Sequence, residues 1–317
     1  MNIPLKALLA TLALSLSTVS GAVLAAGGEI AVIVKSSSSN FWQNVQKGAS
    51  ATIQQKKGYT MSFQGPASEA AVADQVNLVD NAVNRKVAGI VLAASDADAL
   101  IPSIRKAWEA KIPVVLIDSM VSDSGKQYYQ SFLATDNEAA GALIAKELIG
   151  QVGKTGKIAI MSYVAGAGSE VARVGGFTRY IQANSKLAIV GPFYSQSQMA
   201  NALNQTTDVL ASNPDLIGIF GANEPTAIGM ARAIAQSGKA GKVTAFGFDG
   251  NQDEQGFVKD GTLHAVAVQG SFQMGALGVK TVIDVIEGKK VPKFVNTGVV
   301  LVSKKNIDLA EAKNVLY

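Results

Sequence analysis

The chain alternates between short apolar runs and longer stretches in which apolar residues recur at helical spacing. The apolar runs predict strands buried in a parallel sheet, and they lie at 30–34, 59–63, 87–93, 113–117, 128–134, 157–161, 188–194, 216–220, 243–248, 263–268 and 295–302. Helices are predicted between them, at about 40–57, 70–85, 95–110, 135–151, 169–184, 198–212, 223–237, 254–259 and 274–287. Regular strand and helix alternation predicts an α/β fold with helices on both faces of the sheet.

One turn-rich segment, 119–134, interrupts this alternation, which then resumes in the same form. We therefore predict two similar doubly wound parallel-sheet domains, joined by a hinge of several segments and separated by a cleft. The first lobe is predicted to comprise 26–118 with about 251–272, and the second 135–249 with about 273–302. Residues 303–317 are left as a carboxyl-terminal tail.

Two helix starts have the sequence of a capping box, in which a side chain and a backbone amide bond reciprocally. Ser95 with Asp98 predicts the start of the third helix, and Thr135 with Glu138 predicts the start of the fourth. Both assignments start the helix at the first residue of the pair.

Residues 1–25 have the features of a secretory signal peptide. Lys6 precedes an apolar run at 7–16, and small residues precede a cut near Ala25. The alternative is a membrane anchor, but the run is short for a bilayer, and no later run is long enough. Without a cysteine to carry a lipid, the exported protein is expected to be soluble and to reside in a bacterial periplasm.

Composition excludes several classes of function. The 317 residues are 48% hydrophobic, enough to bury two domain cores, and the absence of cysteine excludes disulfides and thiolate catalysis. The formal charge is +4, but Lys and Arg are scattered, so no nucleic-acid partner is expected. No phosphate loop, dinucleotide fingerprint or zinc motif is complete, and the single histidine, His264, is expected on the surface. The sequence therefore predicts no metal, no cofactor and no catalytic residues.

Asp249 is a candidate ligand-binding residue because it follows the predicted strand at 243–248. In open α/β sheets, ligands bind outside the carboxyl ends of the strands, and a carboxylate there can accept hydrogen bonds from a polyol. The alternative is that Asp249 and Gly250 form an ordinary turn.

These polar strand ends lie within a series of short motifs. They are Ile-Ala-Val-Ile-Val-Lys-Ser-Ser-Ser-Ser-Asn-Phe-Trp at 30–42, Val-Val-Leu-Ile-Asp at 114–118, Ala-Thr-Asp-Asn at 134–137, Ala-Arg-Val-Gly-Gly-Phe at 172–177, Ala-Asn-Glu at 222–224, Phe-Gly-Phe-Asp-Gly at 246–250, and Gln269. In order and spacing, they resemble the periplasmic sugar-binding proteins of ABC transporters, of the ribose- and allose-binding type. The resemblance covers nearly the whole exported chain and implies the type 1 periplasmic binding protein fold.

The resemblance also implies a set of sugar-binding residues. They are Lys35, Phe41, Trp42, Asp118, Asn137, Arg173, Asn223, Asp249 and Gln269. In this family an aromatic pair sandwiches the sugar ring, the carboxylates accept hydroxyl hydrogen bonds, and an arginine and amides complete the site. Alternatives are core packing for the aromatic pair, an N-cap role for Asn223 and helix capping for Asn137.

Some positions depart from the ribose-binding pattern. Ser119 stands where ribose binders carry an arginine, Ser39 stands where they carry a ligand amide, and Lys35 replaces a small residue. Lys35 followed by Phe41 and Trp42 is similar to the allose-binding relatives, which indicates a hexose or ketohexose. The alternative is that Lys35 is simply solvated.

The predicted function is capture of a monosaccharide, a hexose, ketohexose or pentose, and its delivery to an ABC transporter membrane permease. A chemoreceptor is a second possible partner, and the protein is expected to act as a monomer. Two alternatives remain: the sugar-sensing domain of a LacI-type regulator, although the first 60 residues contain no helix-turn-helix, and a sugar-modifying enzyme.

Overall fold

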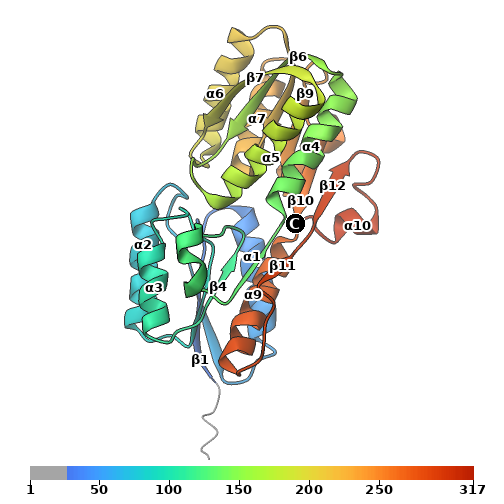
Figure 1. Cartoon of the computed structure of the whole chain (residues 1–317). Coiled ribbons are helices and arrows are strands. Elements are labelled where there is room, and N and C mark those ends of the chain that lie inside the picture. Colours follow the sequence, from blue (N-terminus) through green and yellow to red (C-terminus); the bar gives the residue numbers. More distant parts are fainter. Residues whose placement is uncertain (1–26) are drawn as a thin grey trace, which may run out of the picture.

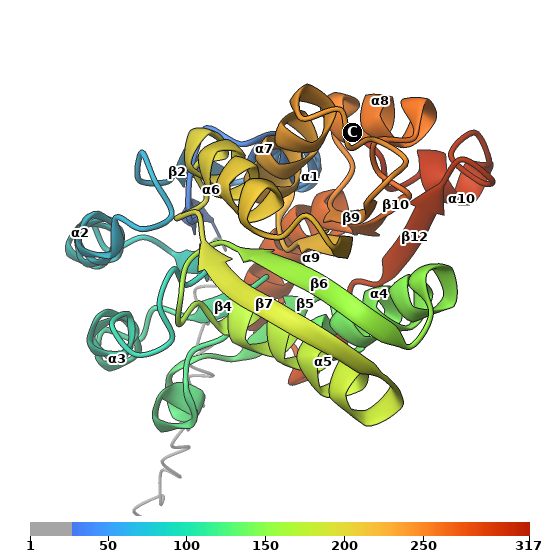
Figure 2. The ribbon, with the colours of Figure 1, turned by 90° about the horizontal axis from the view of Figure 1, so that it is seen from above.

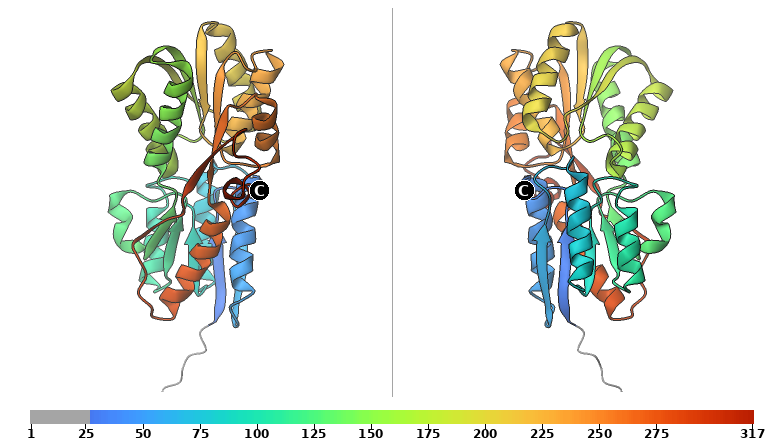
Figure 3. Two further views of the ribbon diagram at one scale, coloured as in Figure 1. Left: turned by 90° about the vertical axis from the view of Figure 1, so that its right-hand side faces the viewer. Right: turned by 90° about the vertical axis from the view of Figure 1, so that its left-hand side faces the viewer.

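The computed structural model describes residues 27–317, and the predicted signal peptide lies outside the described residues. The described chain forms two lobes stacked along one long axis (Figure 1; Figure 3). Each lobe contains a six-stranded sheet flanked by helices, which confirms the predicted fold class. Within these residues, no helix has both the length and the apolar character needed to cross a bilayer.

The first lobe has strand order β11-β5-β4-β3-β1-β2, and all neighbouring strands are parallel. Its elements are β1 (Gly28–Ile33), α1 (Asn40–Ile53), β2 (Tyr59–Gln64), α2 (Val72–Asn84), β3 (Gly89–Leu92), α3 (Ile101–Glu109), β4 (Val114–Ile117), the 3-10 helix η1 (Asp123–Tyr128), β5 (Ser131–Ala134), α9 (Ser271–Ile286) and β11 (Phe294–Asn296).

The second lobe has the corresponding order β12-β10-β9-β8-β6-β7, with only the edge strand β12 antiparallel among its described strands. Its elements are α4 (Asn137–Val152), β6 (Thr155–Ser162), α5 (Gly168–Asn184), β7 (Lys186–Tyr194), α6 (Met199–Ser212), β8 (Leu216–Gly221), α7 (Glu224–Gln236), β9 (Thr244–Phe248), α8 (Gln252–Asp260), β10 (Ala265–Gln269), β12 (Val299–Ser303) and α10 (Ala310–Lys313).

Each sheet is buried on both faces, as its continuous apolar strands require. In β1, Ile30 and Val32 pack with α1 and α9, whereas Ala31 and Ile33 pack with α2 and α3. In the second lobe, helices α4 and α5 cover one face of the sheet and α6, α7 and α8 cover the other (Figure 2). The sheets are thereby fixed, so the strand ends become rigid supports for side chains.

The chain crosses between the lobes after β5, after β10 and between β11 and β12. Two of the crossings lie side by side, because the Thr297 amide donates to the Ala134 carbonyl and the Thr135 hydroxyl donates to the Gly298 carbonyl. The first lobe therefore extends to residue 134, beyond the predicted boundary at 118. These three connections form the predicted multi-segment hinge.

The predicted assignment of the late segments to lobes is reversed for α8, β10, α9 and β11, whereas β12 lies in the second lobe as predicted. Strand β10 pairs with β9 in the second lobe, and α9 returns to the first lobe, where it packs against α1. That helix contact is close because Gly48 and Gly275 leave no side chain between the two backbones. Residues 303–317, predicted as a tail, include α10, which packs on the second lobe.

Three local predictions also need correction. The strand predicted at 295–302 is two strands, β11 and β12, in different sheets. Helix α3 begins only at Ile101, since the Asp96 side chain instead caps a turn by accepting from the Asp98 and Ala99 amides. Helix α4 is capped by Asp136, which accepts from the Ala139 amide.

Candidate functional site

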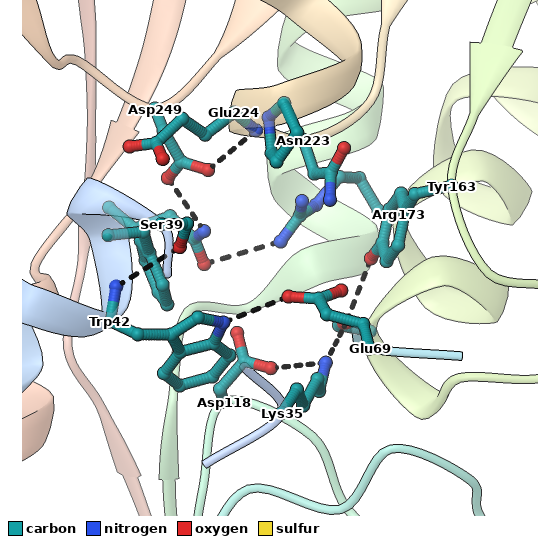
Figure 4. A pocket seen from close by; sticks show the side chains of 14 residues that line it. Lys35, Ser39, Trp42, Glu69, Asp118, Tyr163, Arg173, Asn223, Glu224 and Asp249 are labelled. Atoms are coloured by element: carbon teal, nitrogen blue, oxygen red, sulfur yellow. Dashed lines mark hydrogen bonds and ion pairs between the residues drawn. The ribbon is translucent and has the colours of Figure 1, made fainter. Parts of the chain in front are cut away.

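The carboxyl ends of strands from both sheets face each other at the junction of the lobes, where they surround a small space (Figure 4). This space is lined by Lys35, Ser39, Phe41, Trp42, Glu69, Asp118, Tyr163, Ser169, Arg173, Asn223, Glu224, Pro225, Asp249 and Gln269. The structure thus brings together all the predicted site residues except Asn137. Their role in binding a ligand remains a prediction.

On the first-lobe side, a buried ion pair joins two strand ends. Lys35 follows β1 and Asp118 follows β4, and the Lys35 Nζ lies 2.6 Å from Asp118 Oδ2, with both side chains at most 4% exposed. The solvated alternative for Lys35 is therefore wrong. The Ser119 hydroxyl donates to the same carboxylate oxygen at 2.9 Å, and Asp118 has a left-handed backbone with φ 58°. Such strain at a non-glycine residue is typical of functional sites.

The aromatic pair lies in the first turn of α1, which Ser39 caps by accepting from the Trp42 amide. The rings of Phe41 and Trp42 meet edge to face, with centroids 4.8 Å apart. Both residues line the site and both also belong to the core of the first lobe. Core packing and a place in the site, which the sequence analysis gave as alternatives, are therefore compatible, because packing in the core fixes the rings that border the site.

On the second-lobe side, Arg173 of α5 is the most extensively bonded residue described in the site. Its guanidinium donates to Asn137 Oδ1 from Nε and Nη2, to the Ala222 carbonyl and to Gln269 Oε1. It also lies 3.5 Å from the centroid of the Phe248 ring. Asn137 therefore supports the arginine instead of lining the site, which corrects its predicted position.

Asp249 follows β9 with its carboxylate directed into the site (Figure 4). It accepts hydrogen bonds from Gln269 Nε2 at 2.9 Å and from the Glu224 amide at 3.2 Å. Its φ is 86°, another strained non-glycine position. Burial raises the pKa of Asp249 to about 6, although the positive charge of Arg173 and the Gln269 hydrogen bond act in the opposite direction.

Glu224 occurs in a motif of the sequence but was not predicted as a site residue. Its Oε1 accepts from the Asn40 amide of the first lobe, and its Oε2 accepts from the Tyr317 hydroxyl. Burial, followed by the nearby charge of Asp249, raises the pKa of Glu224 to about 8. Asn223, just before it, caps α7 as the sequence suggested, by accepting from the Thr226 amide.

Five further lining residues were not predicted as site residues: Ser39, Glu69, Tyr163, Ser169 and Pro225. Glu69 lies beyond β2 and Tyr163 follows β6, so the rule applied to Asp249 could have indicated both. Ser169, in the first turn of α5, accepts from Lys35 Nζ at 3.1 Å and shares a hydrogen bond with the Tyr163 hydroxyl at 2.8 Å. No motif in the sequence marks Ser169.

Several of these contacts run from one lobe to the other: Lys35 to Ser169, Asn40 to Glu224, and Ser197 to Glu69. The lobes are therefore closed around the site. The site combines carboxylates, an ammonium group, a guanidinium and amides with two aromatic rings, which suits a compact polar ligand that also has an apolar face.

Two similar lobes around an inward-facing site are the architecture expected of a solute-binding protein. Residues 30–290 match the family described as periplasmic binding protein domain. The chain belongs to this family, which confirms the predicted family and class.

Named relatives share both sequence and fold. The chain is 31% identical over 290 residues to the D-allose-binding periplasmic protein of Escherichia coli K12, covering 88% of this chain and 93% of that protein. Among solved structures, an ABC transporter solute-binding protein from Agrobacterium vitis with bound D-fucose is 70% identical, with a TM-score of 0.91 over 92% of this chain and all of that one. A carbohydrate transporter solute-binding protein from Agrobacterium radiobacter, in complex with D-arabinose, is 32% identical, with a TM-score of 0.88 over the same shares. These relatives are transport proteins, which agrees with the prediction that the chain is not an enzyme.

Proposed function

We propose that this protein captures one monosaccharide between its lobes and delivers it to the membrane permease of an ABC transporter. The observation that carries the proposal is the set of opposed polar side chains around one small space. Asp118 and Lys35 approach from the first lobe, and Arg173 and Asp249 approach from the second. A sugar hydroxyl both donates and accepts hydrogen bonds, so it can pair with either kind of group.

The aromatic rings supply the second half of the recognition. Phe41 and Trp42 offer apolar surface to the C–H face of a sugar ring, while the charged groups bind its rim. A wrong epimer would leave a buried carboxylate or guanidinium without a partner, which costs about 1–3 kcal/mol or more. The site is therefore expected to discriminate strongly between epimers.

For the sugar itself we propose a six-carbon pyranose, with D-fucose as the first candidate. The support is the D-fucose named as the ligand of the Agrobacterium vitis relative, which is 70% identical to this chain. The hexose or ketohexose that Lys35 indicated agrees with this choice. D-allose, D-arabinose and D-ribose are the sugars named for more distant relatives.

We also propose that the protein is exported to the periplasm after cleavage near Ala25, and that it acts there as a monomer. The family description and the amino-terminal sequence support this location. We propose a chemoreceptor as a second partner that binds the same closed form.

Calorimetric titration of residues 26–317 against D-fucose, D-galactose, D-allose, D-arabinose, D-ribose and D-tagatose tests the function. Saturable heat with one binding site is expected for D-fucose, with weaker or no heat for most others. Absence of heat with every sugar would refute monosaccharide binding. Conversion of any bound sugar during the titration would favour the enzyme alternative instead.

A further inference from the structure

Glu69 makes two contacts that no family motif predicts. It lies in the loop between β2 and α2 of the first lobe, is 8% exposed and lines the site. Its Oε1 accepts a hydrogen bond from the indole Nε1 of Trp42 at 2.9 Å. Its Oε2 accepts from the hydroxyl of Ser197, across the cleft in the second lobe, at 2.7 Å. One carboxylate therefore holds an aromatic ring of the site and the opposite lobe together.

The Ser197 side of this contact is held rigidly. Gln196 and Ser197 both have left-handed backbones, with φ of 57° and 53°, which fixes the direction of the Ser197 side chain. The Ser197 hydroxyl also accepts from Asn223 Nδ2 at 3.0 Å. A continuous chain of hydrogen bonds thus runs from Trp42 through Glu69 and Ser197 to Asn223.

Both ends of this chain are predicted sugar contacts on opposite lobes. Opening the cleft has to break the Glu69–Ser197 bond, because it joins the two lobes directly. Both donors to Glu69 are neutral, so the buried carboxylate depends on them for its stabilisation. Losing the Ser197 donor while the lobes stay closed would leave one carboxylate oxygen short of a hydrogen bond.

The same pair stands between two spaces. Glu69 lines the inner site, and Glu69 and Ser197 both line an outer polar groove that is also bordered by Ser39 and Gln198. Glu69 therefore lies at the boundary between the two spaces, together with Ser39, Glu224 and Pro225. The contact is thus placed where it can delay release.

We propose that Glu69 is a positioning residue that fastens the closed lobes through Ser197 and fixes the Trp42 indole, so that it controls how long the sugar stays bound. This inference rests on the proposed function, since it assigns a role within the same site. The proposed role of Glu69 is to set the residence time of the sugar and the orientation of the Trp42 ring. The charged groups of the site determine which sugar binds.

Stopped-flow measurement of D-fucose dissociation tests the proposal with Glu69→Ala, Ser197→Ala, the double variant and the conservative Glu69→Gln. Each alanine variant should dissociate about tenfold faster, as expected for loss of a hydrogen bond to a charged group. The double variant should dissociate more slowly than the product of the two single effects predicts, because both substitutions remove the same Glu69–Ser197 bond. Glu69→Gln should lie between wild type and alanine, since an amide can still accept from Trp42.

Gln198→Ala is the matched control. The Gln198 amide donates to the Ser68 hydroxyl at 3.2 Å, also between lobes, but this bond is exposed and neutral. Its loss should change the dissociation rate less than about twofold. Unchanged dissociation in both alanine variants, or effects that simply multiply in the double variant, would overturn the proposal.

A second readout does not depend on any sugar. The chain has two tryptophans, so Trp108→Phe leaves Trp42 as the single tryptophan, whose emission can be excited selectively over that of tyrosine. In that background Glu69→Ala should increase acrylamide quenching of Trp42, whereas Glu69→Gln should not. Equal quenching in all variants would contradict the positioning role. If the wild-type protein bound no sugar of the panel, the proposed function would be refuted. The quenching measurement would still test whether Glu69 positions Trp42.

Discussion

Replacing Asp249 with asparagine should change ligand affinity and protein stability in opposite directions. Two of the roughly four acceptor positions of the carboxylate are occupied, by Gln269 and by the Glu224 amide, which leaves about two for sugar hydroxyls. A hydrogen bond to a charged group contributes about 1.5–3 kcal/mol. Asparagine keeps one acceptor and turns the other into a donor, so D-fucose affinity should fall about 10²- to 10³-fold.

Stability should rise instead, because burial disfavours the ionised form of Asp249. The pKa of Asp249 is raised from 3.8 to about 6 in the folded protein. A shift of about two pK units at about 1.4 kcal/mol each corresponds to about 3 kcal/mol of destabilisation. One mismatched hydrogen bond in the variant costs about 1 kcal/mol, so the net gain should be about 2 kcal/mol.

This gain should depend on pH in a defined direction. Between about pH 4 and 6 the folded wild-type protein binds more protons at Asp249 than the unfolded chain, so wild-type stability falls as the pH rises. The gain in Asp249→Asn should therefore be present above about pH 6 and absent near pH 4. Urea unfolding at both pH values and calorimetry at the higher one measure the two effects. A variant that bound D-fucose like wild type, or that was less stable at pH 8, would refute this reasoning.

Three further variants test other parts of the site. Lys35→Met leaves Asp118 buried without its cation, so D-fucose affinity by calorimetry should fall at least about a hundredfold; a change under about threefold would contradict a structural ion pair. Asn137→Ala removes the acceptor that orients Arg173, and affinity should fall about tenfold although Asn137 does not line the site; unchanged affinity would show that Arg173 needs no such support. Ionisation of Glu224, whose pKa is about 8 in the closed lobes, opposes closure, so the wild-type Kd should rise from about pH 5 to 8 and then level off. Glu224→Gln should flatten that profile, and an identical profile in both proteins would exclude this role.

The elements of the fold were accessible from the sequence because each depends on local patterns. Apolar runs such as 114–117 and 216–221 are strands buried on both faces, and the polar residues that follow them lie at the site. The assignment of late segments to lobes was not accessible in the same way. The apolar face of α9 could cover either sheet. Its place in the first lobe depends on the close packing of α9 against α1 at Gly48 and Gly275, which is seen only in the folded structure.

The site was predicted as far as strand ends and family motifs could identify it. Asn137 was placed in the site by the family motif at 134–137, yet it bonds Arg173, 36 positions away. Glu69 follows β2 but belongs to none of the family motifs, and its contact with Ser197, 128 positions away, depends on how the two lobes meet. The Asn137–Arg173 contact depends on how α4 packs against α5 within the second lobe. The order of residues along the chain reveals neither arrangement.

A crystal structure of residues 26–317 grown with D-fucose would show whether a single sugar ring is held between the two lobes. We expect one pyranose beside Phe41 and Trp42, with hydroxyls hydrogen-bonded to Asp118 and Asp249. A sugar bound elsewhere, or an empty cleft at saturating D-fucose, would contradict it.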